Sequence, residues 1–200
     1  MAAPAEDSVV TESSILDSCI EVSAPTTPIP KEQSMLKQKL KHVMQQEYPC
    51  YSFEFFPPKT KQGLVNLTER IRRMGYSQPL WVDITHSKLS KTLELAELLL
   101  DYTTVDIMVH LAMTNMTKKD LTMFLDSCKD LGIRNILAIR GDPPRGYDSW
   151  LPVDDDLQYS ADLVSFIRKE YGDYFTIFVG AYPEGHHNSN TQEEDLKHLK

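Results

Sequence analysis

The 200-residue sequence predicts an α/β protein of the (β/α)8 TIM-barrel class, with about the first five βα units present. Short apolar segments alternate with helical patterns, and they recur every 26 to 40 residues or so. Polar residues follow nearly every apolar segment. Because the carboxyl ends of parallel barrel strands meet on one face, these polar residues are expected to form one site. That arrangement is typical of an enzyme.

The first 30 residues differ in composition from the rest. Residues 1–30 are rich in Ser, Thr, Pro and Ala, with five acidic residues and no Lys or Arg. Such a segment buries too little apolar surface to offset its chain entropy, so we expect a disordered tail. Thr27 precedes a proline and is a candidate site for a proline-directed kinase.

The elements after the tail are predicted from periodicity. Residues 31–48 read as a basic amphipathic helix, because apolar residues fall on one face and lysines elsewhere. Residues 49–200 read as a partial barrel. Strands are predicted at residues 51–56, 80–85, 106–111, 135–140 and 175–181, where short apolar runs suggest burial on both faces. Helices are predicted at residues 61–74, 90–101, 118–131 and 160–171 and from about 191, with Thr117 as an N-cap and Gly132 as a C-terminal stop.

Periodicity alone leaves an open doubly wound sheet as the alternative fold. A dinucleotide-binding sheet of that kind expects a GxGxxG turn after its first strand. This chain has Pro57 and Pro58 at that place, and only eight glycines in total. A rigid prolyl turn cannot bring the backbone close to a pyrophosphate, so the barrel is favoured.

Charge and composition exclude several classes. The net charge of -8, with 29 acidic against 21 basic residues, argues against a nucleic-acid partner. No apolar run reaches the roughly 18 residues of a membrane span. Three widely spaced cysteines fit reduced thiols, so we expect a cytoplasmic protein. Neither HxxxH nor HExxH occurs, so no metal site is expected, and a homo-oligomer is left open.

Glu54 is the leading candidate for acid chemistry. It lies inside an apolar strand, and alternation places it opposite Phe53 and Phe55, in the mouth of the barrel. Apolar surroundings favour a protonated carboxyl group, which suits a general acid. The alternative is a buried glutamate paired with an arginine such as Arg140.

Further candidates follow the later strands. At Arg140-Gly141-Asp142 the glycine permits close approach of a ligand, the arginine can hold an anionic group, and the carboxylate can stabilise a developing cation; a surface ion pair is the alternative. His110 is equally compatible with two roles. It can donate a hydrogen bond to a ligand, or it can be a core residue whose hydrogen bonds are made within the protein. Tyr159 and Tyr182 can stack on a planar ring or pack in the core.

Six segments together resemble the methylenetetrahydrofolate reductase family, in the family's order. They are residues 52–59, 83–85, 109–111, 135–143, 159–164 and 179–186. The motifs EFFPP and YPEGH lie within them, and RGDPP begins in the fourth segment and ends at Pro144. The resemblance covers about residues 50–200, and the combination of the three motifs is far more specific than any one alone.

The resemblance implies an FAD-dependent barrel. Hydride would pass from NAD(P)H to FAD and then to 5,10-methylenetetrahydrofolate, giving 5-methyltetrahydrofolate, so folate and nicotinamide small molecules are the implied partners. By resemblance Glu54 is the catalytic general acid, and Asp142 is a second catalytic residue that also faces the substrate. The cofactor-binding residues implied in this way are Thr85, His110, Arg140, Asp142, Tyr159, Ser160, Tyr182, His186 and Asp195. His86, which stands where the family has an aromatic residue, and Gly141, which permits close approach of a ligand, complete the predicted cofactor-binding set.

The sequence is compatible with three hypotheses about activity. The 200 residues alone are expected to have little or no turnover, because a complete barrel needs typically about 250 residues. A short chain of this kind can instead be a non-catalytic isoform that binds or regulates a full-length reductase. The third hypothesis is a non-flavin barrel hydrolase that uses Glu54 and Asp142 as an acid/base pair.

Overall fold

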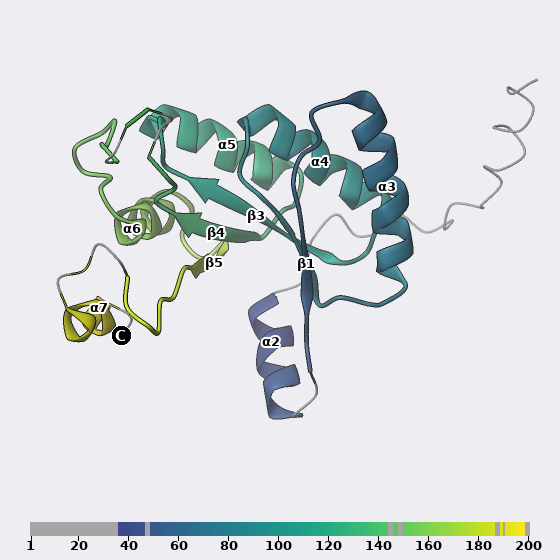
Figure 1. Cartoon of the computed structure of the whole chain (residues 1–200), viewed down its shortest axis with the longest axis horizontal. Helices are drawn as coiled ribbons and strands as arrows, with labels where there is room; N and C mark the ends of the chain where they lie inside the picture. The colour runs from purple at the N-terminus through teal and green to yellow at the C-terminus, as the bar shows by residue number, and fades with distance from the viewer. Residues whose placement is uncertain are drawn as a thin grey trace, which may run out of the picture. The chain divides into compact units, whose positions relative to one another are not determined.

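A five-stranded parallel sheet organises the chain, with strand order β1-β2-β3-β4-β5 (Figure 1). The strands are β1 (Ser52–Phe55), β2 (Trp81–Ile84), β3 (Asp106–Ala112), β4 (Asn135–Ile139) and β5 (Thr176–Val179). Each strand pairs in parallel with the next one along the chain. A doubly wound sheet reverses its strand order at a switch point, and this sheet does not. The predicted α/β barrel class and its five βα units are therefore confirmed.

The computed structural model describes residues 36–46, 49–143, 146–147, 150–186, 189 and 191–198. All of them belong to one unit of the chain, residues 31–200. The predicted tail over residues 1–30, with its candidate phosphorylation site at Thr27, lies outside the described residues.

The helices agree closely with the sequence pattern. They are α2 (Leu36–Gln45), α3 (Lys61–Gly75), α4 (Leu89–Tyr102), α5 (Lys118–Asp130), α6 (Ser160–Tyr171) and α7 (Gln192–His198). Thr117 caps α5 as predicted, because its hydroxyl accepts from the backbone N–H of Asp120 at 3.2 Å. Gly132 follows that helix with a φ of 77°. Within the described ranges, no helix combines the length and apolar character needed to cross a membrane.

The strand register separates two faces of the sheet. Phe55, Ile84, Val109, Ile136 and Ile177 align on the face against which the helices pack, and Ile84, Val109 and Ile136 are fully buried there. Glu54, Asp83, Met108, Asn135 and Thr176 align on the opposite face, which we call the inner face. In Figure 1, α3, α4 and α5 run along one side of the sheet. The inner face is thus the side on which polar groups gather.

The outer strands are less buried than the sequence predicted. Every residue of β3 is buried, as expected for a strand covered on both faces. In β1 and β5 only Phe55 and Thr176 are buried, so the prediction is wrong for these two strands. The reason is that each pairs with a single neighbour among the described strands.

Helix α2 lies at the amino ends of the strands. The ammonium group of Lys39 contacts the carboxylate of Asp106, the first residue of β3, at 2.8 Å. Leu36 at the start of the helix is completely buried. The loops that follow the strands, where the candidate site residues lie, are at the opposite edge of the sheet.

Candidate active site

Glu54 lies on the inner face of β1 beside the end of β2. Its Oε1 accepts a hydrogen bond from the Thr85 hydroxyl at 2.6 Å, and its side chain is 47% exposed. The register confirms the predicted side, opposite Phe53 and Phe55. The predicted burial is wrong, because the phenylalanines face the helices and leave Glu54 open. Among the described residues, no ion pair joins Glu54 to Arg140.

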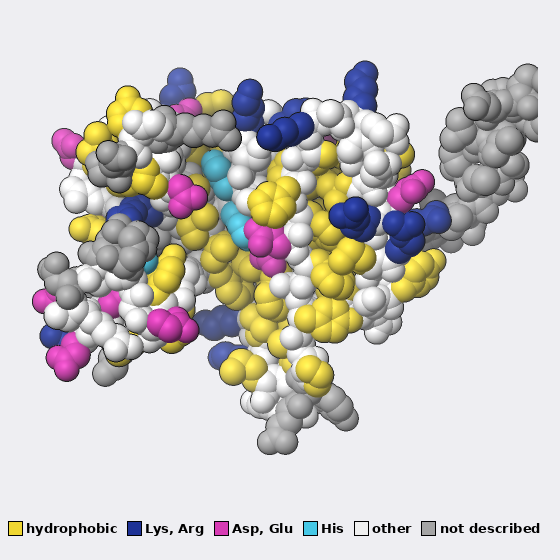
Figure 2. All heavy atoms as spheres, in the orientation of Figure 1, with side chains coloured by type: hydrophobic (Ala, Val, Ile, Leu, Met, Phe, Trp, Pro, Cys, Tyr) yellow, Lys and Arg dark blue, Asp and Glu magenta, His cyan; other side chains and the backbone are white. Residues whose placement is uncertain are grey.

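His110 lies between two carboxylates. Its Nδ1 is 3.6 Å from Glu54 Oε1, and its Nε2 is 3.4 Å from Asp83 Oδ1. The other oxygen of Asp83 accepts from the indole N–H of Trp81 at 2.7 Å. Three adjacent strands thus hold a line of polar contacts, and we call Glu54, Asp83, Thr85 and His110 the acid–histidine cluster. Figure 2 shows histidine side chains beside acidic ones near the middle of the visible face.

His86 adjoins this cluster as a neutral ring. Its Nδ1 accepts from the backbone N–H of Ala112 at 3.3 Å. Burial is the largest cause and lowers the pKa of His86 from its ordinary value. His110 acts in both directions, because a backbone hydrogen bond to it raises this pKa and its charge, to a smaller extent, lowers it. An imidazole that accepts at Nδ1 must be unprotonated there, so the lowered pKa and the hydrogen bond agree.

A second group follows β4 and centres on Thr114. The Thr114 hydroxyl lies 3.2 Å from the carbonyl oxygen of Arg140 and 2.9 Å from that of Asp142, and it accepts from the indole N–H of Trp150 at 3.0 Å. Gly141 between them has a φ of +87°, and a Cβ there would lie 2.5 Å from Thr114 Oγ1. The protein's own packing therefore requires a glycine at this position, independently of any ligand.

Arg140 and Asp142 do not pair with each other. The Arg140 guanidinium lies over the Trp150 ring, 5.6 Å from its centroid, while Asp142 is exposed. The alternative of a simple surface ion pair is wrong for this conformation, because the Arg140 guanidinium lies over Trp150 and no salt bridge joins it to Asp142. Both side chains remain available at the carboxyl end of β4.

A third group follows β5. The ring of Tyr182 meets that of His186 edge-on, with centroids 4.6 Å apart. The backbone N–H of His186 donates to Asp195 Oδ2 at 2.8 Å, and the Ser189 hydroxyl donates to Oδ1 at 3.0 Å. The Asp195 carboxylate thus joins α7 to the loop after β5, and in this conformation it has protein partners on both oxygens.

Tyr159 and Ser160 lie at the start of α6. The Asp162 carboxylate accepts from the backbone N–H of Tyr159 at 2.8 Å, which caps the helix and leaves the Tyr159 ring outside. Tyr159 is 61% exposed and Tyr182 is 49% exposed. The alternative that these two rings pack in the core is wrong, and both present aromatic surface at the strand ends.

The predicted residues therefore fall into three groups at one edge of the sheet. The structure brings Glu54, Thr85, His86 and His110 together, then Arg140 with Gly141 and Asp142, then Tyr182 with His186 and Asp195, while Tyr159 and Ser160 stand at α6. Within the described ranges, no three His, Cys, Asp or Glu side chains are placed to hold a metal ion.

Four polar residues of the site were missed from the sequence: Trp81, Asp83, Thr114 and Trp150. Asp83 and Trp81 precede Thr85 by two and four residues, so strand alternation could have placed all three on one face. Thr114 and Trp150 meet across 36 residues of chain, and no local pattern signals that contact.

Comparison with known proteins identifies the family. The family model for methylenetetrahydrofolate reductase matches residues 39–200, which is most of the chain. This chain belongs to the methylenetetrahydrofolate reductase family. The predicted membership is thereby confirmed.

Three relatives show how far the family likeness extends. Methylenetetrahydrofolate reductase 2 of Schizosaccharomyces pombe is 45% identical over 148 residues, which cover 72% of this chain and 23% of that protein. Methylenetetrahydrofolate reductase (NADH) 1 of Arabidopsis thaliana is 43% identical over 152 residues, which cover 74% of this chain and 26% of that protein. Probable methylenetetrahydrofolate reductase (NADPH) of Caenorhabditis elegans is 31% identical over 199 residues, which cover 94% of this chain and 29% of that protein. The chain thus spans about a quarter of the length of the family members it matches.

Proposed function

We propose that this chain carries the proton-delivering part of a flavin-dependent methylenetetrahydrofolate reductase site. The overall reaction would reduce 5,10-methylenetetrahydrofolate to 5-methyltetrahydrofolate with NAD(P)H as hydride donor. The observation that carries the proposal is Glu54 on the inner face, hydrogen-bonded to Thr85 and adjacent to His110. Membership of the family favours this reaction over a barrel hydrolase that uses Glu54 and Asp142.

The residues at the strand ends fit FAD. The exposed rings of Tyr159 and Tyr182, the cation of Arg140 and the uncharged His86 suit a planar ligand that carries phosphates. The residues that would hold it are Thr85, His86, His110, Arg140, Gly141, Asp142, Tyr159, Ser160, Tyr182, His186 and Asp195. When bound, FAD supplies hydride transfer between nicotinamide and folate.

Glu54 is the proton donor in this proposal. Its carboxyl group gives a proton to the folate nitrogen that leaves the one-carbon bridge, and the bridged ring opens as that N–C bond breaks. The Thr85 hydroxyl, 2.6 Å from Oε1, orients the carboxyl group. Asp142, exposed at the end of β4, stabilises the positive charge that develops on the one-carbon unit.

The test separates the two half-reactions in a protein with a complete barrel. Residues 39–200 replace the matching segment of the A. thaliana relative, and rapid-mixing absorbance follows flavin reduction and folate-driven reoxidation separately. Glu54→Gln removes the donated proton at nearly constant shape. We expect reoxidation by the folate to slow by about 100-fold or more, with reduction by the nicotinamide unchanged.

A matched control distinguishes this effect from a general loss of charge. Glu69→Gln makes the same substitution at an exposed glutamate on α3 and should change neither half-reaction. Equal loss of both half-reactions in Glu54→Gln, or loss of neither, would contradict the role given to Glu54.

For the 200 residues alone, we propose little or no turnover and keep the regulatory isoform as the alternative role. Purification of this chain as a colourless, inactive protein agrees with both. Its recovery with a tagged full-length reductase favours the regulatory role, whereas an active yellow enzyme would contradict both.

A further inference from the structure

The two carboxylate oxygens of Asp83 contact two different partners. Oδ2 accepts from the Trp81 indole N–H at 2.7 Å, and Oδ1 lies 3.4 Å from His110 Nε2. The Asp83 side chain is only 11% exposed, so water does not compete freely for these contacts. An indole N–H only donates, so Trp81 requires an acceptor at this oxygen of residue 83.

This arrangement selects one tautomer of His110. An ionised carboxylate only accepts, so in the neutral ring the proton lies on Nε2, toward Asp83. Nδ1 then presents a lone pair, and it lies 3.6 Å from Glu54 Oε1. A lone pair beside a carboxyl group favours the protonated acid, whereas an N–H there would favour the carboxylate. Burial lowers the pKa of the third ionisable neighbour, His86, and so disfavours its charged form.

We infer that Asp83, held by Trp81, is a positioning residue that fixes the Nε2–H tautomer of His110 and so favours the acid form of Glu54. The first part concerns only this chain's own side chains. The second part rests on the proposed function, in which Glu54 must carry a proton before each turnover.

The substitution Asp83→Asn tests the first part. The Trp81 N–H takes the amide oxygen, which leaves the amide NH₂ facing His110 Nε2. That nitrogen must then accept, and the ring proton moves to Nδ1. Long-range ¹H–¹⁵N spectra of the ¹⁵N-histidine-labelled chain at alkaline pH report the tautomer, with His110 assigned by a His110→Gln variant. We expect the Nε2–H pattern in the wild type and the Nδ1–H pattern in Asp83→Asn.

A second substitution on Trp81 provides the rescue. In the double variant Trp81→Phe with Asp83→Asn, the amide is free to turn its oxygen toward His110, and the Nε2–H pattern should return. A merely structural role for Trp81 predicts no such return. The control Asp106→Asn alters another buried carboxylate, the one that pairs with Lys39, and should leave the His110 tautomer unchanged.

The outcomes separate the inference from the proposed function. An Nε2–H ring in Asp83→Asn, or an Nδ1–H ring that persists in the double variant, overturns the inference whatever the activity. In the barrel-completed protein, Asp83→Asn should lower kcat for the folate step by about 10- to 100-fold at unchanged KM, and the double variant should recover most of it. An inverted tautomer with an unchanged folate step overturns the link to Glu54, and Glu54→Gln then decides separately whether Glu54 is the acid.

Discussion

Gly141 shows how a single position constrains the site. Its left-handed backbone turns the chain between Arg140 and Asp142, whose carbonyl oxygens both lie close to the Thr114 hydroxyl. A Cβ at residue 141 would lie only 2.5 Å from Thr114 Oγ1 and 3.0 Å from the Ala112 Cβ. The direction in which Asp142 leaves β4 therefore depends on the absence of a side chain at residue 141.

Replacing Gly141 by alanine should destabilise the fold for two reasons. The left-handed φ costs an alanine about 1–2 kcal/mol, and the contact with Thr114 adds about 1 kcal/mol or more of overpacking. Gly146 is a matched control, because its φ of +89° is nearly the same but no described residue lies within 4 Å of its Cβ position. Free energies of unfolding from urea titrations should fall further for Gly141→Ala than for Gly146→Ala. Equal losses would show that the Thr114 contact does not matter.

His86 gives the fold a pH dependence of definite sign. Its pKa is lower in the folded protein than its ordinary value of 6.5, mainly because it is buried. Between 6.5 and that lower pKa the unfolded chain binds the proton more readily, so the free energy of unfolding falls as the pH falls through this window. Above 6.5 both states are neutral and the effect is absent.

The substitution His86→Gln isolates this contribution. The glutamine amide oxygen can accept from the Ala112 N–H but does not titrate. Between about pH 8 and about pH 5.5, the wild type should lose more unfolding free energy than His86→Gln in denaturant titrations. Parallel losses in the two proteins would exclude His86 as the titrating group.

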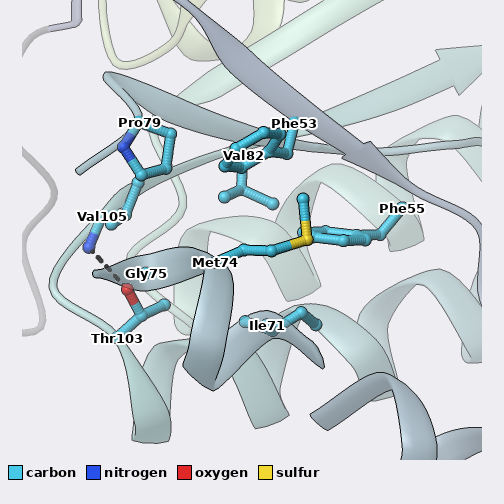
Figure 3. A pocket seen from close by; sticks show the side chains of 9 residues that line it. All are labelled: Phe53, Phe55, Ile71, Met74, Gly75, Pro79, Val82, Thr103 and Val105. Atoms are coloured by element: carbon cyan, nitrogen blue, oxygen red, sulfur yellow. Dashed lines mark hydrogen bonds between the residues drawn. The ribbon is translucent and has the colours of Figure 1, made fainter. Parts of the chain in front are cut away.

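At the scale of elements, the end of α3 packs loosely against the sheet. A cavity of about 10 Å³ remains between the helix and strands β1 and β2. Figure 3 shows Phe53, Met74 and Val82 around it, with Gly75 at its rim. A Cβ added at Gly75 would meet no atom of the described residues within 4 Å, and no positive φ is needed there.

Gly75→Ala is therefore expected to stabilise the protein. Alanine restricts the unfolded chain and favours the helix, which together contribute about 0.5–1 kcal/mol. Thermal unfolding should show a higher Tm, by a few degrees for a chain of this size. An unchanged or lower Tm would mean that α3 moves when Gly75 gains a side chain.

The element pattern was predictable because it is local. Periodicity located five strands and the helices between them to within about two residues, and α6 began and ended at the predicted residues. Exposure of the outer strands was not predictable in this way, because it depends on how many neighbours a strand has. Glu54 was placed on the correct face, yet its burial was overestimated for the same reason.

At the scale of the whole molecule, the candidate site was predictable as a set of strand ends but not as a set of contacts. Parallel strands bring Glu54, His110 and Arg140 to one edge, and alternation states which side each strand residue faces. The pairing of His110 with Asp83 depends on the register between β2 and β3, which no local pattern records. Alternation along β2 could have placed Trp81 and Asp83 on the face of Thr85, but the contact of Asp83 with His110 arises only from that register.

Because each of the five described strands pairs only with its sequence neighbours among them, this sheet can grow in the order in which a ribosome releases it. Each newly emerged strand finds its docking edge already present, and no earlier segment has to wait for a distant later one. Until the following strand arrives, the most recent one is exposed along one side to pairing with other chains. Self-association during synthesis is therefore the hazard of this topology, and it moves along the nascent chain from one strand to the next.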